Sequence, residues 1–120
     1  MDDVLGVKSY SLALRVFKLY KYLQDEHKEY VLSKQVLRSG TSIGALIKEA
    51  QYAQSRKDFI NKLSISLKEA NETGYWLKLL KDSNYISEEL YACIEPDVIE
   101  LIKILTSSIN TTKENEQRNL

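Results

Sequence analysis

The sequence lacks the residues that several classes of protein need. It contains four Gly and one Pro, too few for the frequent turns of an all-β fold. Its single cysteine, Cys93, excludes an internal disulfide framework and is typical of a reducing compartment. No apolar run approaches the roughly 20 residues that cross a membrane, and the opening Met1-Asp2-Asp3 is acidic where a signal peptide is basic. These absences predict a cytoplasmic protein.

Residues that carry catalysis are also scarce. His27 is the only histidine, and it lies in a charged stretch that we expect to be a connection. Glu69 and Glu72 have the spacing of the Glu-x-x-His pairs in di-iron bundles, but no histidine takes part. No Gly-rich phosphate loop or dinucleotide-binding motif is present, and Cys93 has no evident activating neighbour. We therefore predict that the protein is not an enzyme and that it has no catalytic, metal or cofactor site.

What the sequence does contain is helical periodicity. A chain of 120 residues, 43% apolar and 28% charged, fits one globular domain over residues 1–120. Apolar residues recur three and four positions apart in four segments, over residues 8–25, 33–54, 55–81 and 87–112. Four amphipathic helices with short connections pack most simply as an antiparallel up-down-up-down bundle. The predicted fold class is all-α.

Local signals mark where these helices begin and bend. Ser33, Ser55 and Ser87 are the expected N-caps of the last three helices. Pro96 predicts a kink or a restart inside the fourth helix, because proline lacks the backbone N–H. From about Thr112 onward the chain is polar and is expected to fray.

The spacing also predicts which faces pack inward. On the first helix the expected inner residues are Ala13, Val16, Phe17, Tyr20 and Leu23, flanked by Leu12 and Leu19. The second helix contains Gly40 and Gly44, each of which costs a helix about 1 kcal/mol relative to Ala. That cost indicates a close approach to the backbone, by a neighbouring helix or alternatively by a ligand or a nucleic-acid backbone.

Charge is balanced overall but not along the chain. Residues 1–81 carry 14 Lys or Arg against 9 Asp or Glu, whereas residues 82–120 carry 3 against 8. A basic stripe of this kind is a candidate nucleic-acid-binding surface, formed by Arg15, Lys18, Lys21, Lys34, Arg38 and Lys48. The alternative is that the last helix, in the same chain or in a neighbouring copy, supplies the counter-charges.

The third helix carries a second apolar line outside its core stripe. Ile65, Trp76 and Leu79 share an arc of this helix with Glu69 and Glu72. One interpretation is a broadly buried helix; the other is a subunit interface with these five residues, since Trp at the edge of an apolar patch is a favoured anchor. We also expect Arg38 to bridge to Glu69 or Glu72 and not to be a free phosphate contact, because a guanidinium can span two helices.

The stretch Leu37-Arg38-Ser39-Gly40-Thr41-Ser42-Ile43-Gly44-Ala45 resembles helix 2 of a bacterial four-helix bundle family, known from proteins encoded in intervening sequences of 23S rRNA genes. Residues 49–59 are similar to that family's junction between helices 2 and 3, and residues 67–77 to its paired glutamates followed by Trp-Leu. Asp97, Glu100, Leu101 and Leu105 fit its last helix. The resemblance covers nearly the whole chain; Leu46 departs from it, since members usually carry Asn there.

The resemblance implies an antiparallel bundle that assembles as a ring, typically a homopentamer. It also implies a relation to the accessory protein of diversity-generating retroelements, a strongly basic pentamer that binds nucleic acid and a reverse transcriptase. Two functions follow as expectations. One is a nucleic-acid-associated accessory module that binds RNA or DNA weakly and without sequence preference. The alternative is an oligomeric scaffold for protein partners that binds no nucleic acid.

Overall fold

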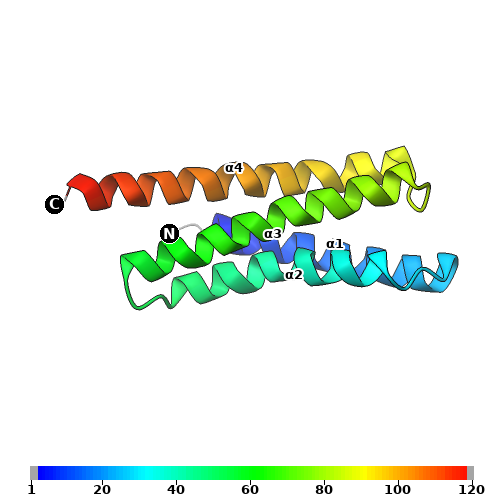
Figure 1. Ribbon diagram of the computed structural model, residues 1–120, viewed down its shortest axis with the longest axis horizontal. Coiled ribbons are helices and arrows are strands. Elements are labelled where there is room, and N and C mark those ends of the chain that lie inside the picture. The colour runs from blue at the N-terminus through cyan, green and yellow to red at the C-terminus, as the bar shows by residue number, and fades with distance from the viewer. Residues whose placement is uncertain (1–2, 119–120) are drawn as a thin grey trace.

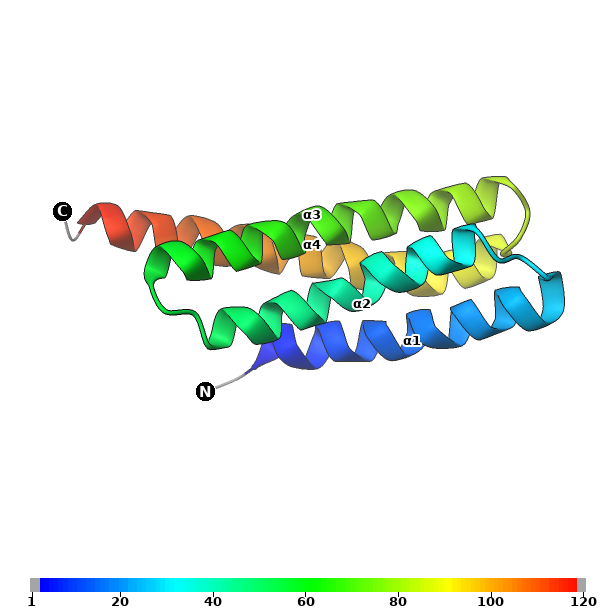
Figure 2. The same ribbon diagram turned by 60° about the horizontal axis from the view of Figure 1, so that its bottom comes forward.

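The computed structural model describes residues 3–118, which form helices and no strand. The helices are α1 (Val4–His27), α2 (Leu32–Gln51), α3 (Arg56–Asp82) and α4 (Glu88–Arg118). Helices α1 and α3 each pack against both α2 and α4 (Figure 1). The colours in Figure 2 run in opposite directions along successive helices. This part of the chain is therefore an all-α bundle, with extents of 54 × 24 × 22 Å; the predicted domain limits at residues 1 and 120 lie outside it.

Helix α1 begins one turn before the predicted start. The side chain of Asp3 caps it by accepting a hydrogen bond from the backbone N–H of Gly6 at 3.0 Å. The helix ends where Lys28 adopts a left-handed φ of 51° and donates its backbone N–H to the carbonyl of Leu23. His27 therefore belongs to the helix and not to the connection that we predicted.

Two of the three predicted serine caps are confirmed. Ser55 Oγ accepts a hydrogen bond from the backbone N–H of Asp58 at 3.0 Å, at the start of α3. Ser87 Oγ accepts one from the backbone N–H of Leu90, also at 3.0 Å, at the start of α4. Both serines therefore satisfy N–H groups that the first turn of a helix leaves without partners.

The predicted cap of α2 by Ser33 is wrong. The carboxylate of Glu29 accepts the backbone N–H groups of Val31, Leu32 and Ser33 at 3.2, 3.0 and 2.7 Å. Ser33 lies one residue inside the helix, is buried, and donates its hydroxyl to the backbone carbonyl of Glu29 at 2.8 Å. Glu29, in the connection between α1 and α2, therefore caps α2 in place of Ser33.

Helix α4 runs unbroken through Pro96 to Arg118. The helix does not restart at Pro96, because the proline is exposed and removes only one backbone hydrogen bond. Residues beyond Thr112 also remain helical where we expected the chain to fray. The carboxyl end of α4 consequently extends beyond the other helices (Figure 1).

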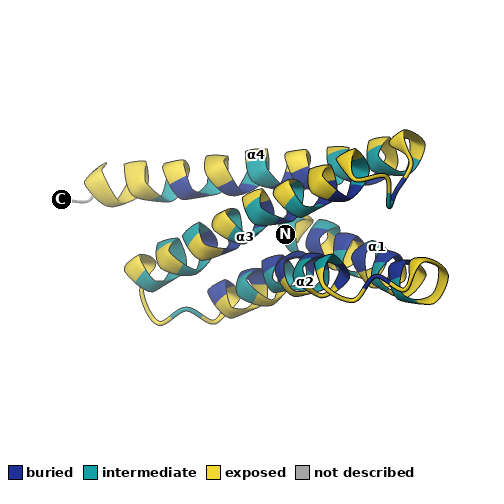
Figure 3. Cartoon of the chain, turned by 45° about the vertical axis from the view of Figure 1, so that its right-hand side comes forward, coloured by how far each residue is buried: buried dark blue, intermediate teal, exposed yellow. Residues whose placement is uncertain are grey.

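The core lies between the inner faces of the four helices (Figure 3). On α1 the buried apolar residues are Leu12, Val16, Leu19 and Leu23. Phe17, expected inside, is half exposed, so the inner face is rotated relative to the prediction. Apolar residues surround much of α1, and their spacing alone did not decide which of them would be buried.

Helices α1 and α2 approach each other closely at the two glycines of α2. A Cβ on Gly40 would lie 2.8 Å from Cγ1 of Val16, and a Cβ on Gly44 would lie 3.1 Å from Oγ of Ser9. Val16 and Ser9 are buried residues of α1. The glycines therefore make room for a neighbouring helix, which was the first of the two predicted explanations for them.

Candidate functional site

Arg38 connects α2 to α3 through two carboxylates. Its Nη1 lies 3.0 Å from Oε2 of Glu69, and its Nη2 donates to Oε1 of Glu72. Trp76, one turn further along α3, donates its indole N–H to the same Glu72 oxygen at 3.1 Å. The predicted pairing of Arg38 with acids of α3 is confirmed for both glutamates.

The two glutamates differ in their electrostatic environment. Hydrogen bonds from Arg38 and then from Trp76 hold the pKa of Glu72 below its usual value. Burial, reinforced by the adjacent Glu72, raises the pKa of Glu69, in spite of the Arg38 guanidinium. One guanidinium thus serves two carboxylates.

The candidate interface residues of α3 surround this network. Ile65 and Leu79 have 39% and 36% of their surface exposed. Trp76 is partly buried and packs against the core, so it belongs to the bundle as well as to its surface. Ile65, Leu79 and Trp76, together with Glu69 and Glu72, are called the α3 face below.

The basic candidates on α1 divide into two groups. Arg15 pairs with Asp97, and the nearby Lys8 pairs with Glu100 at 2.8 Å. Both acids lie on α4 of the same chain, so counter-charges from the last helix are supplied within the molecule at these positions. Lys18 and Lys21 are exposed and form no ion pair with residues 3–118.

The basic candidates on α2 divide in the same way. Arg38 is held by α3, as described above. Lys34 and Lys48 are exposed and have no acidic partner in the described part of the chain; the Lys48 ammonium lies 5.8 Å from the centre of the Tyr52 ring. Of the six predicted residues, four lysines therefore face solvent, and the two arginines are paired.

The described residues can also be compared with the requirements of a metal site and of a membrane span. Glu49 of α2 is not grouped with Glu69 and Glu72; its Oε1 lies 3.6 Å from Lys62 Nζ. Among residues 3–118 no three His, Cys, Asp or Glu side chains gather as metal ligands would. None of the helices over the same range is long and apolar enough to span a bilayer.

Sequence reasoning missed an apolar row on α1. Val7, Tyr10, Leu14 and Phe17 are all exposed and recur at intervals of three, four and three residues, which places them on one side of the helix. This spacing was available as a signal, but Phe17 was assigned to the core. We call these four residues the α1 row.

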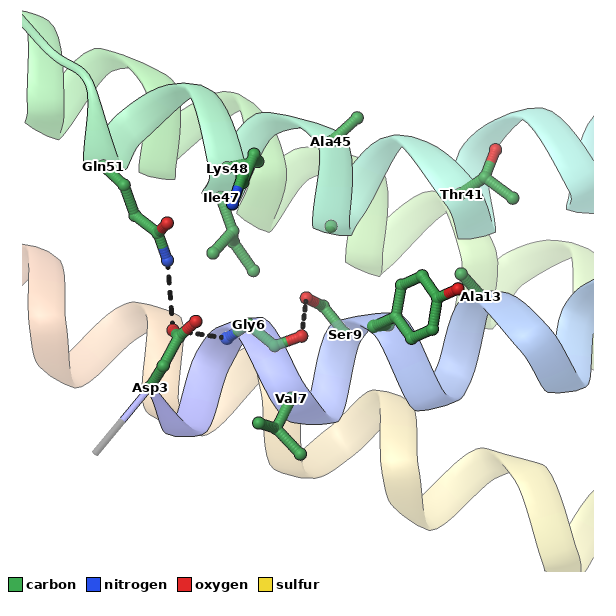
Figure 4. A pocket seen from close by; sticks show the side chains of 12 residues that line it. Asp3, Gly6, Val7, Ser9, Ala13, Thr41, Ala45, Ile47, Lys48 and Gln51 are labelled. Atoms are coloured by element: carbon green, nitrogen blue, oxygen red, sulfur yellow. Dashed lines mark hydrogen bonds between the residues drawn. The ribbon is translucent and has the colours of Figure 1, made fainter.

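A groove of about 710 Å³ lies beside the α1 row, between α1 and α2. Small side chains from both helices, such as Ala13 and Ala45, line it (Figure 4). At one end, Gln51 of α2 donates its amide to the carboxylate of Asp3 at 3.1 Å, so the two helices are joined there. The groove is largely apolar, with Lys48 at its rim.

Comparisons with known proteins agree with this arrangement. The chain has a TM-score of 0.87 and 58% sequence identity to a crystal structure from Bacteroides thetaiotaomicron, described as a protein with unknown function from the S23 ribosomal protein family. That likeness covers 88% of this chain and 97% of the other. No curated protein matches the chain. Residues 5–107 match the family described as 23S rRNA-intervening sequence protein. Since this match spans most of the sequence, the chain belongs to the 23S rRNA-intervening sequence protein family.

Proposed function

We propose that the protein is a non-enzymatic cytoplasmic scaffold, an antiparallel up-down-up-down bundle that assembles into a ring, with five copies as the favoured number. The observation that carries this proposal is the α3 face. Ile65 and Leu79 are exposed on either side of a partly buried Trp76, and exposed apolar surface of this kind is typical of protein contacts. A ring multiplies weak attachments to a partner through avidity.

The charges favour a scaffold over a nucleic-acid-binding module. Arg15 is occupied by Asp97, and Arg38 by Glu69 and Glu72. Arginine is the side chain best suited to grip phosphate with two hydrogen bonds, and neither arginine of the candidate surface is free to do so. The chain as a whole carries no net charge, whereas nucleic-acid-binding domains are usually basic.

Light scattering of the purified chain tests the assembly. Five chains of 13.9 kDa give a particle of about 70 kDa, whereas a monomer at micromolar concentration would refute the ring. Leu79→Asp should weaken assembly, because it places a charge on the α3 face. Asn71→Asp is the matched control, since it introduces the same charge on the same helix at an exposed position away from that face. Trp76→Ala is a poorer probe, because Trp76 also packs against the core.

A second candidate function is weak, sequence-tolerant binding of RNA or DNA. The observation in its favour is that Lys18, Lys21, Lys34 and Lys48 are exposed without acidic partners among the described residues. Phosphate contacts of this kind release counter-ions, so the affinity should fall log-linearly with salt.

A gel-shift series with structured RNA at rising salt tests this candidate. The triple variant Lys18→Glu, Lys21→Glu and Lys34→Glu should abolish binding, whereas Lys103→Glu on α4 should lower it only slightly. Arg15 is left in place, because its replacement would also remove the partner of Asp97. No shift even at low salt would leave the scaffold as the only function proposed.

A further inference from the structure

The α1 row exposes more apolar surface than the α3 face does. Val7 and Tyr10 are 69% and 67% exposed, and Leu14 and Phe17 are 49% and 50% exposed. Large apolar side chains scattered singly over a surface are ordinary, but four in one row form a continuous patch. Nothing within residues 3–118 covers this patch, which therefore has the character of a contact surface.

The groove beside the row gives this surface its shape. Gly6 and Ala13 of α1 and Gly44 and Ala45 of α2 line it. The glycines have no side chain and the alanines only a methyl group, so a depression remains beside Val7 and Tyr10, which also line the groove. Large side chains of a partner can enter such a depression, as hot-spot residues do in protein interfaces. The surface therefore fits a helix that presents bulky apolar side chains.

The charges beside the α1 row restrict which helix can dock there. No acid occurs between Asp3 and Asp25, and exposed Lys18 and Lys21 flank the row. Two α1 rows in parallel contact would bring these lysines of both copies together, which is unfavourable. The α3 face instead carries Glu69 and Glu72, which share a single guanidinium, so its two carboxylates complement the lysines.

The positions of the α1 row and the α3 face in the bundle also suit a ring. Helices α1 and α3 are diagonal in the bundle and do not contact each other among the described residues. A surface that pairs with itself yields a dimer and stops, whereas a ring requires two different surfaces on each subunit. The chain presents two such surfaces on diagonal helices.

We propose that the α1 row of one copy docks onto the α3 face of a second copy, with Tyr10 and Leu14 against Trp76 and Leu79. This inference rests on the proposed assembly and supplies the second half of its subunit contact. It also makes Lys18 and Lys21 part of the contact between copies, where they lie near Glu69 and Glu72 of the neighbour.

Two complementary variants test the docking. The first carries Tyr10→Asp and Leu14→Asp on the α1 row, and the second carries Ile65→Asp and Leu79→Asp on the α3 face. Each variant alone should be monomeric by light scattering, at 13.9 kDa. Mixed in equal amounts they should form a one-to-one complex of about twice that mass, because one intact α1 row and one intact α3 face remain in the mixture.

The outcomes separate this inference from the proposed ring. If the parent assembles and the α1-row variant assembles equally well, the docking is wrong while the ring survives with another contact. If both variants are monomeric but do not pair when mixed, the two surfaces are not partners and the docking is again wrong. A monomeric parent would instead refute the ring itself. Circular dichroism confirms that each variant is folded, and Tyr10→Ser with Leu14→Ser replaces any α1-row variant that is not.

Discussion

At the scale of single residues, the space around a glycine decides the effect of adding a methyl group. Gly40 and Gly74 both lie inside helices, where alanine is intrinsically favoured by about 1 kcal/mol. A Cβ on Gly40 would lie within 3 Å of both methyl groups of Val16, whereas a Cβ on Gly74 would lie 3.9 Å from the nearest atom of Val98. The two positions therefore differ in packing and not in propensity.

We predict that Gly40→Ala destabilises the protein and that Gly74→Ala stabilises it. Val16 is β-branched, buried and stiff, so the clash at Gly40 should cost about 1–3 kcal/mol. The Gly74 variant should gain up to about 1 kcal/mol. Urea unfolding measures both. Equal effects of the two substitutions would show that the close approach of α1 and α2 does not limit the size of the residue at position 40.

Glu29 is a buried carboxylate that replaces a conventional N-cap. Burial alone would raise its pKa, but the backbone N–H groups of Leu32, Ser33 and Val31 outweigh that effect, and the pKa lies below the ordinary value of 4.5. A carboxyl group whose pKa is lower in the folded state stabilises the fold above its unfolded pKa. That contribution is lost as the pH falls below about 4.5 towards the folded pKa.

We therefore predict a pH-dependent cost for Glu29→Ala. The substitution should lower the free energy of unfolding by about 1–2 kcal/mol at pH 7, as for the loss of a helix cap. Below pH 4.5 the difference between parent and variant should shrink, because Glu29 is then being protonated in the parent. Thermal melts from pH 3 to pH 7 measure this, with exposed Glu26→Ala as the control. A difference that grows on acidification would contradict the capping role.

At the scale of helix pairs, α2 and α3 are joined by polar as well as apolar contacts. Ser66 donates to the carbonyl of Ile43 at 2.9 Å, and Thr73 donates to Ser39 Oγ at 3.0 Å. These groups are buried and hydrogen-bonded, so a shift of one helix along the other would leave them without partners. Arg38 adds the ion pairs at the edge of the same contact.

We predict that Arg38→Ala lowers the free energy of unfolding by about 1–2 kcal/mol. Glu69 is largely buried, so the lost cation leaves a carboxylate with poor access to water; the half-exposed guanidinium keeps the cost below that of a buried pair. Lys34→Ala on the same helix removes an exposed charge and should change stability by less than about 0.5 kcal/mol. A double-mutant cycle with Glu72→Gln measures the coupling, and a coupling of zero would contradict the bridge.

Much of the helix arrangement and of the Arg38 network could be predicted from the sequence, and the errors have physical causes. The spacing of apolar residues predicted all the helices, and Arg38 was paired correctly because two glutamates one turn apart form a fitting target. Phe17 was misplaced because α1 is apolar over more than one face, and periodicity does not choose between two apolar faces. The cap of α2 was missed because Glu29 reaches it from the preceding connection, outside the usual cap position.

At the scale of the molecule, basic residues of the first part of the chain form ion pairs with acidic residues of the last helix of the same chain. Lys8 and Arg15 pair with Glu100 and Asp97 across the contact of α1 with α4. Sequence alone left open whether the same chain or a neighbouring copy supplied these acids, because the choice depends on which helices are adjacent. Because these charges are paired within one chain, the proposed assembly would depend on apolar surfaces more than on these charges.

If the subunits assemble as proposed, the thermal midpoint should rise with protein concentration. Folding is then coupled to association, so mass action stabilises the folded chain as subunits are added. We expect a rise of a few degrees across a hundredfold range for the parent. The variant with Ile65→Asp and Leu79→Asp should melt at a temperature independent of concentration. Calorimetry at several concentrations measures both, and a constant midpoint for the parent would argue against assembly.

The order of the helices around the core has a consequence for how fast the chain folds. Each helix packs against its neighbours in sequence, and only the contact of α1 with α4 joins distant segments, with Arg15 and Asp97 separated by 82 positions. Because local contacts close short loops, such a topology folds quickly. The α1–α4 contact has the longest loop to close and should form after the rate-limiting step. Asp97→Asn should therefore accelerate unfolding and leave the refolding rate nearly unchanged in stopped-flow experiments, so the first opening of the folded bundle would be the departure of α1 from α4.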